Sequence, residues 1–115
     1  MICVADINTA TFLKINPAFA KTLGFSEEEL LDRPFLDFIH PEDIESTKTV
    51  INKKLKTGEE VINFVNRYRC ADGTYRWLEW VSRPVPERGI TFAVAHDITN
   101  HMRIEEALQE SEALI

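Results

Sequence analysis

The sequence predicts an α+β domain made of two short strands, a block of helices, three further strands and a last helix. The chain has 115 residues, of which 44% are apolar and 28% charged, as expected for one soluble domain with a single core. Apolar residues recur at helical spacing before Gly58 and with a period of two after it. This change of period separates the helical block from the second group of strands, an order typical of α+β proteins.

Capping residues mark the elements of the first half. Asn16 before Pro17 predicts a helix start, because Asn is a favoured N-cap and Pro suits the first helical position. Ser26 and Glu29 have the spacing of a capping box, which predicts a second short helix. The predicted elements are strands at 1–7 and 11–15, helices at 16–24 and 26–32, a helical turn at 34–39 and a longer helix at 41–58.

Turn residues divide the second half into three strands. Asp72 followed by Gly73 is a strong hairpin signal, and the proline-containing segment 84–89 predicts the next turn. The predicted strands are 61–70, 75–85 and 90–98. Thr99 or Asn100 is expected to cap a last helix that runs to Glu112 or beyond.

Charge and composition exclude several classes of function. A net charge of −6 argues against a nucleic-acid-binding surface, which needs clustered Lys and Arg. No apolar run approaches the roughly 20 residues of a membrane span, and no signal peptide is recognisable, so we expect a cytoplasmic domain without direct membrane insertion. Cys3 and Cys70 lie far apart, as in proteins of reducing compartments, and form no metal-binding spacing with the three histidines. No metal site is predicted.

The chain also lacks the short motifs of common enzymes. It contains no Gly-x-Ser-x-Gly, no Walker loop and no His-Glu-x-x-His, and its acidic clusters at 27–29 and 105–106 fall on solvated helix faces. We therefore predict that the domain has no catalytic residues. A small-molecule-binding fragment of an enzyme stays as an alternative.

Motifs along nearly the whole chain resemble those of a PAS domain with its C-terminal PAC motif, a sensing and dimerising module of signalling proteins. They are Asn16-Pro17-Ala18-Phe19, Leu23-Gly24-Phe25, His40-Pro41-Glu42-Asp43 and Asp97-Ile98-Thr99. The resemblance implies a five-stranded antiparallel sheet with short helices across one face and a C-terminal exit helix. It also implies a bacterial or archaeal signalling protein in which residues 1–99 form the sensor and residues 100–115 begin a coiled-coil-like helical linker to a downstream effector.

The resemblance further implies which side chains face a ligand pocket. Carried over position by position, the inward set is Cys3, Ala5, Leu13, Ile15, Phe19, Leu23, Phe35, Phe38, Phe64, Asn66, Tyr68, Leu78, Trp80, Ala93 and Ala95. Most of these residues would also serve as ordinary core, since the buried face of any one-sided sheet is apolar. Asn66 differs, because a buried amide needs a partner, which can be Tyr68, a backbone group, water or a ligand.

The same resemblance bears on cofactors. Flavin-binding light sensors of the family need a reactive Cys in the region where this chain has Phe35, and haem-binding members typically need a His on the long helix, where none occurs. We expect neither flavin nor haem. Binding of an unknown small molecule stays open.

Apolar residues also occur where the sheet would face outward. The predicted interface comprises Val61, Val65, Trp77, Ile90, Phe92 and Val94, together with Ile104 and Leu108 of the last helix. Ile104, Leu108 and Ile115 have heptad spacing, with Ser111 in a polar slot. These patterns favour a homodimer that passes a signal through Asp97 and Thr99 to an effector such as a histidine kinase or diguanylate cyclase. A ligand-free dimerisation module is the alternative.

Overall fold

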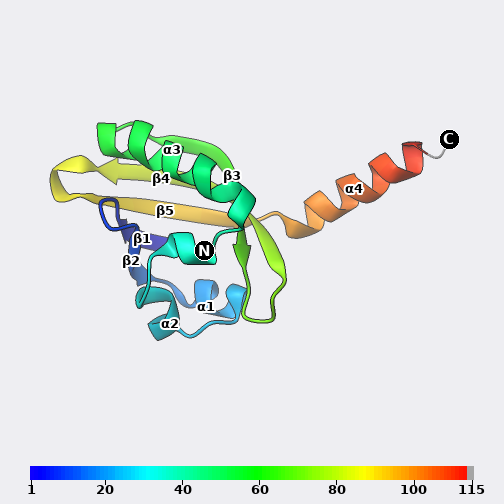
Figure 1. The fold of residues 1–115 in the computed structure, drawn as a ribbon, viewed down its shortest axis with the longest axis horizontal. Helices are drawn as coiled ribbons and strands as arrows, with labels where there is room; N and C mark the ends of the chain where they lie inside the picture. Colours follow the sequence, from blue (N-terminus) through cyan, green and yellow to red (C-terminus); the bar gives the residue numbers. More distant parts are fainter. Residues whose placement is uncertain (114–115) are drawn as a thin grey trace.

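The computed structural model describes residues 1–113, which form one five-stranded antiparallel sheet, short helices packed against it, and a last helix that extends away from it (Figure 1). In chain order the elements are β1 (Ile2–Asp6), β2 (Thr11–Ile15), α1 (Pro17–Leu23), α2 (Glu27–Leu31), η1 (Phe35–Phe38), η2 (Pro41–Asp43), α3 (Ile44–Lys53), η3 (Leu55–Thr57), β3 (Val61–Arg69), β4 (Tyr75–Val85), η4 (Pro86–Arg88), β5 (Ile90–Asp97) and α4 (Thr99–Ala113), where η marks a 3-10 helix. The predicted α+β architecture is confirmed.

The strand order is β2-β1-β5-β4-β3, so β5 lies in the centre between β1 and β4. The two hairpins of the sequence, β1–β2 and β3–β4, therefore occupy opposite halves of one sheet. In the second hairpin, Asp72 Oδ1 accepts the backbone N–H of Thr74 at 2.9 Å, and Gly73 adopts a φ of 85° that suits glycine. The Asp72-Gly73 turn thus forms where the sequence predicts it.

The starts of α1 and α2 follow the predicted capping residues with one difference. The Ser26 hydroxyl accepts the backbone N–H of Glu29 at 3.1 Å and so caps α2. Asn16 stands at the N-cap of α1, but its Oδ1 accepts the N–H of Ile2 at 3.1 Å instead of a helical N–H. Asn16 therefore ties the start of α1 to β1.

The predicted long helix at 41–58 is three consecutive segments, η2, α3 and η3. His40 Nδ1 accepts the N–H of Glu42 at 3.0 Å, which favours a tight first turn. Asp43 then has φ −103° and ψ −3°, outside the regular helical range, and its carboxylate is directed to Arg67. Gly58, with a φ of 86°, ends the last segment.

A β-bulge in β2 corrects one predicted inward residue. Lys14 pairs with Val4 and Phe12 pairs with Ala5, so Leu13 is an extra residue without a partner across the ladder. Leu13 is 47% exposed, whereas Phe12 is buried. The prediction that Leu13 faces the pocket is wrong, because the bulge shifts the alternation by one residue and turns Phe12 inward.

A second bulge, in β3, corrects one predicted outward residue. Val61 pairs with Ser82, and Phe64 pairs with Trp80. The chain advances three residues on β3 between these pairs but only two on β4, so β3 contains one extra residue. Asn63, between them, takes a φ of 57°. Val61 consequently faces the same side as Phe64 and is only 3% exposed. Its prediction as part of an outer interface is wrong.

The last helix, α4, has few contacts with the rest of the domain. It projects beyond the end of the sheet (Figure 1), and both Ile104 and Leu108 are exposed. The predicted heptad position Ile115 lies outside the described residues. Over residues 1–113, no helix is both long enough and apolar enough to cross a membrane.

Candidate functional site

A cavity of about 70 Å³ lies between the inner face of the sheet and the segment that contains α3. Predicted pocket residues that line it are Cys3, Ala5, Phe35, Phe64, Asn66, Tyr68, Trp80 and Ala93. Lining residues that the sequence analysis missed are Phe12, Thr47, Val50, Ile51, Leu55, Val61, Ser82 and Thr91. The strands therefore contribute one wall, as expected from their alternation, and the helical segment 47–55 contributes the other.

The remaining predicted pocket residues lie elsewhere. Leu13 is on the surface, and those that pack into the core without lining the cavity are Ile15, Phe19, Leu23, Leu78 and Ala95. Phe19 is nevertheless close behind the cavity wall, with its ring centroid 5.3 Å from that of Phe12 and 6.1 Å from that of Trp80.

Asn66 is buried in the cavity wall, and its amide has two protein partners. Trp80 Nε1 donates to Asn66 Oδ1 at 2.8 Å, and Asn66 Nδ2 donates to Thr47 Oγ1 at 3.2 Å. Thr47 Oγ1 in turn donates to the backbone carbonyl of Asp43 at 2.8 Å. The amide therefore joins both walls of the cavity, and its burial cost is offset by these hydrogen bonds.

The titratable groups of the cavity are uncharged at neutral pH. Burial raises the pKa of the Cys3 thiol to about 12 and raises the pKa of the Tyr68 phenol well above its usual value. At another part of the wall, the hydroxyls of Ser82 and Thr91 hydrogen-bond to each other. The cavity thus combines an apolar surface with a few neutral polar groups.

Asp43 and Arg67 form an ion pair beside the cavity. Asp43 Oδ2 accepts the backbone N–H of Arg67 at 2.8 Å and its Nε at 2.9 Å, while Oδ1 accepts Nη2 at 2.8 Å. The guanidinium also lies 5.0 Å from the centre of the Trp77 ring. Hydrogen bonding to Arg67 holds the pKa of Asp43 below its usual value. The ion pair links Asp43, the residue directly before α3, to Arg67 on β3.

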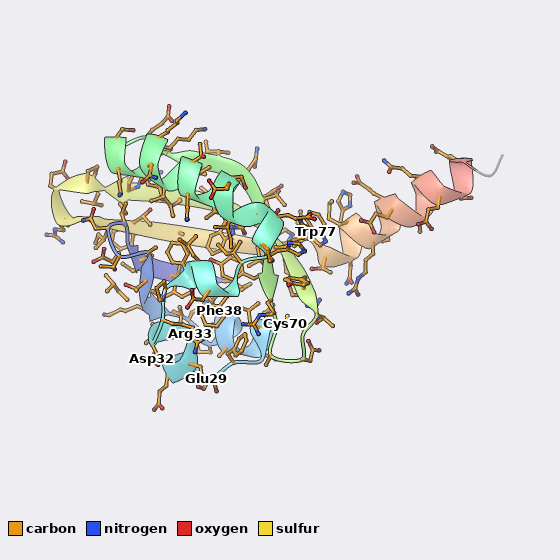
Figure 2. The ribbon with its side chains drawn as sticks, viewed as in Figure 1. Glu29, Asp32, Arg33, Phe38, Cys70 and Trp77 are labelled. Atoms are coloured by element: carbon orange, nitrogen blue, oxygen red, sulfur yellow. The ribbon has the colours of Figure 1, made fainter. Side chains whose placement is uncertain are left out.

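The residues Asp97 and Thr99, predicted as a signalling joint, meet where the sheet ends and α4 begins. Thr99 is 1% exposed, and its Oγ1 accepts the backbone N–H of Trp77 at 2.9 Å. Asp97 Oδ1 accepts the backbone N–H of Thr99 at 3.0 Å and also its hydroxyl proton, while Oδ2 lies 3.5 Å from Arg76 Nη1. Figure 2 shows Trp77 beside the start of α4. The prediction that Thr99 or Asn100 caps this helix is wrong, because α4 already begins at Thr99 and the Thr99 hydroxyl bonds Trp77 and Asp97 instead of a helical N–H. The first residue of the helix is therefore held by the sheet.

The outer face of the sheet carries an apolar patch. Cross-strand pairing aligns Ile2 with Val94 and Val81, and Val4 with Phe92 in the next row. Phe92 is 50% exposed, and Ile2, Val81 and Val94 are exposed to a similar extent. We call Ile2, Val4, Val81, Phe92 and Val94 the outer patch.

The other predicted interface residues lie apart from the outer patch or at its margin. Val65 pairs with Glu79, which also pairs with His96, so this polar row separates Val65 from the patch. Trp77 is half-buried under Arg67, and Ile90 is half-buried where β5 begins. Ile2, Val4 and Val81 belong to the patch but were not predicted, although their alternation with inward residues could have indicated them.

A second cleft, of about 230 Å³, lies at the surface near α2 and the end of β3. It is lined by Phe25, Glu29, Asp32, Arg33, Phe38 and Arg69, most of which are labelled in Figure 2. Phe38, predicted to close the main pocket, lines this cleft instead. Two carboxylates and two guanidiniums balance its charge, so the cleft offers no net attraction to an ion. Among the described residues, no group of His, Cys, Asp and Glu side chains could hold a metal ion.

Comparison with known proteins places this geometry in a family. The family model described as PAS fold matches residues 12–94, a range that ends before Asp97-Ile98-Thr99. An uncharacterised protein of Sinorhizobium fredii, y4lL, is 32% identical over 108 residues, which cover 88% of this chain but only 12% of that protein. The chain thus corresponds to a small part of this curated relative.

Solved structures give the same result. The PAS-B domain of Drosophila melanogaster Cycle, solved with bound ethylene glycol, has a TM-score of 0.73 and 25% identity, covering 84% of this chain and 97% of that one. A histidine kinase domain from Haloarcula marismortui, for which light and redox sensing has been suggested, has a TM-score of 0.70 and 28% identity, covering 85% of this chain and 88% of that one. Because these relatives include an insect protein, the bacterial or archaeal origin stays a prediction. With the family model spanning most of the chain and the sheet and helices in matching order, the protein belongs to the PAS fold family.

Proposed function

We propose that this domain is a sensory module that detects a small molecule in its cavity and passes the change through α4 to an effector in the same polypeptide. The observation that carries the proposal is the joint at Thr99, where the sheet and the helix share hydrogen bonds. The domain itself would have no catalytic role, and its ligand would be neither haem nor flavin. A histidine kinase or a diguanylate cyclase is the proposed effector.

A continuous set of contacts between the cavity and the joint supports this proposal. Asn66 in the cavity wall contacts Thr47, and Thr47 contacts the backbone of Asp43. Asp43 binds Arg67, the Arg67 guanidinium packs on Trp77, and the Trp77 N–H is donated to Thr99. A ligand that displaces Asn66 or Thr47 would therefore disturb groups connected to the first turn of α4.

Removing the Thr99 hydroxyl should uncouple α4 from the sheet. In Thr99→Ala, the Trp77 N–H loses its acceptor, which should lower the free energy of unfolding by roughly 1–2 kcal/mol. The free-energy difference between two signalling states is of similar size. Effector activity should therefore change by more than the loss of folded protein explains. The measurements are thermal melts of this chain and effector activity of the polypeptide that carries it.

Two variants control this experiment. Thr99→Ser keeps the hydroxyl and should behave like the parent, while Thr49→Ala removes an exposed helical hydroxyl that donates to the carbonyl of Glu45 and should leave output unchanged. If output in Thr99→Ala falls only in proportion to the folded fraction, the residue is an ordinary helix-start residue and the proposed transmission is wrong.

The outer patch favours a second function, self-association, with or without a ligand. Its apolar side chains are about half exposed and adjoin one another across three strands, a kind of surface that often marks a protein–protein contact, and Ile104 and Leu108 add exposed apolar residues on α4. We propose a homodimer that buries the outer patch.

The variant Phe92→Glu tests this second function. A carboxylate in the middle of the outer patch should weaken self-association at least tenfold, because a symmetric contact would bring two buried like charges together. Leu13→Glu is the matched control, since Leu13 is equally exposed but lies on the bulge of β2. Analytical ultracentrifugation gives the association constants and far-UV circular dichroism the fold. Unchanged association in Phe92→Glu would remove the outer patch from the interface.

A further inference from the structure

The Tyr68 hydroxyl is a polar group without a protein partner inside the cavity. Tyr68 lines the cavity and is 2% exposed, yet no hydrogen bond within the described residues involves its phenolic oxygen. Every fully shielded side-chain nitrogen or oxygen among these residues does have a partner. The Tyr68 hydroxyl therefore retains a small accessible surface, which a partner placed in the cavity that Tyr68 lines could reach.

The other polar atoms of the cavity are largely occupied by one another. Trp80 Nε1 is donated to Asn66, one Asn66 amide proton is donated to Thr47, and Ser82 and Thr91 bind each other. An amide nitrogen carries two protons, so Asn66 keeps one more donor. Asn66 and Tyr68 lie two residues apart on the same face of β3, roughly 7 Å along the strand. This wall therefore keeps two donors, the second Asn66 N–H and the Tyr68 O–H, that an acceptor oxygen could use.

The lining excludes a charged ligand. None of the lining residues is Asp, Glu, Lys, Arg or His, and Cys3 and Tyr68 are both neutral at physiological pH. An ion brought into this cavity would leave water without gaining an opposite charge, which is strongly unfavourable. The occupant must therefore be neutral.

The volume sets an upper size for the occupant. The cavity measures about 70 Å³. An engineered apolar cavity of about 150 Å³ accommodates benzene, so a molecule smaller than benzene fits here without rearrangement of the core.

We propose that the cavity binds a small neutral molecule with an apolar body and one acceptor oxygen, such as a short-chain ketone, aldehyde or ester, and that Tyr68 is the residue that recognises this oxygen. The proposal deepens the sensory function proposed above and rests on it. In this arrangement the phenol donates its proton to the ligand oxygen, and the apolar body contacts the aliphatic and aromatic walls. A hydrocarbon of the same shape lacks the acceptor and offers the Tyr68 hydroxyl no hydrogen bond.

Two isosteric probes and one substitution test the inference. Cyclobutanone and methylenecyclobutane differ only in whether the ring carries an oxygen or a CH₂ group. Tyr68→Phe should weaken cyclobutanone binding roughly three- to tenfold, the loss of one net hydrogen bond, while methylenecyclobutane binding stays within twofold. Affinities come from amide chemical-shift titrations that follow β3 and β4. The control is Tyr75→Phe, because Tyr75 does not line the cavity.

The stability of the variant without ligand gives an independent readout. A hydroxyl without a protein partner adds no hydrogen bond on folding, so Tyr68→Phe without ligand should melt at the parent's temperature or above it. A melting temperature several degrees lower would mean that the hydroxyl is already bonded, which would overturn the inference. Equal effects of Tyr68→Phe on both probes, or no perturbation of β3 and β4 by cyclobutanone, would overturn it as well.

These outcomes separate the ligand class from the sensory function. If cyclobutanone binds through Tyr68 but hydrogen exchange of α4 does not change, the ligand class stands and the proposed transmission fails. If Thr99→Ala alters output while the probes show no dependence on Tyr68, transmission stands and the ligand class fails.

Discussion

Replacing Phe19 by Ala should lower the free energy of unfolding by roughly 3–5 kcal/mol, the cost of removing a fully buried aromatic ring. Phe19 is 0% exposed and packs against Phe12 and Trp80, two residues of the cavity wall. Domains of this kind are typically stable by about 5–15 kcal/mol, so the variant should remain folded at low temperature but unfold at much lower urea concentration. Urea denaturation monitored by tryptophan fluorescence measures the change.

The same substitution should enlarge the space behind the cavity wall. Loss of the ring leaves the side chains of Phe12 and Trp80 without support on one side, so benzene should bind Phe19→Ala and stabilise it, while the parent should not respond. Leu13→Ala is the matched control, because Leu13 is 47% exposed and lies outside the outer patch, so its truncation should cost less than about 1 kcal/mol. A loss for Phe19→Ala as small as that of the control would show that the ring is not part of a close-packed core.

Replacing Arg67 by Met should lower the free energy of unfolding by roughly 2–3 kcal/mol, because it removes hydrogen bonds between charged groups and leaves Asp43 without its partner. The methionine keeps much of the apolar stem that packs near Trp77. Arg83→Met is the matched control, since the ion pair of Arg83 with Glu60 is largely exposed and should contribute less than about 1 kcal/mol.

The variant should also change how stability depends on pH. Arg67 lowers the pKa of Asp43 in the folded protein, so the contribution of this pair is present above the unfolded-state pKa of 3.8 and is lost as pH falls through the lower folded value. Arg67→Met should remove this acid-dependent part. The carboxyls of Asp6 and Asp72, whose pKa values are also lowered by local hydrogen bonds from Thr9 and Thr74, should titrate as before. Stability curves from pH 2 to pH 6 that are parallel for parent and variant would contradict this role of Asp43.

Much of the fold follows from local signals in the sequence. Ser26 with Glu29 and Asp72 with Gly73 act within a few residues, so their helix cap and hairpin form as predicted. The alternation of β5 also holds along the strand, with Ala93 and Ala95 inward and Phe92 outward. Such features need no knowledge of distant partners.

The two β-bulges could not be predicted from local sequence signals. A period of two indicates which residues share a face only while pairing is regular, and one extra residue reverses the phase. Leu13 and Val61 were assigned to the wrong faces for this reason. The extra residues become visible only when β2 is aligned with β1 and β3 with β4.

The helical wall of the cavity was missed although the sequence contains a signal for it. Thr47, Ile51 and Leu55 recur every four residues and therefore share one side of the helical segment, and a buried Asn66 requires a polar partner such as Thr47. The Asp43–Arg67 pair joins residues 24 positions apart, which no local pattern indicates.

The positions of the two bulges also bear on how copies of this domain meet. Because the strand order is β2-β1-β5-β4-β3, the bulged strands β2 and β3 are the two edges of the sheet. A regular edge strand offers a row of unpaired N–H and C=O groups to any other strand, and an irregular one interrupts that row. Leu13 interrupts this row of backbone groups on the edge strand β2, and Asn63 interrupts it on the edge strand β3. Growth of the sheet from one molecule into the next, the route toward fibrils, is thereby disfavoured at either edge.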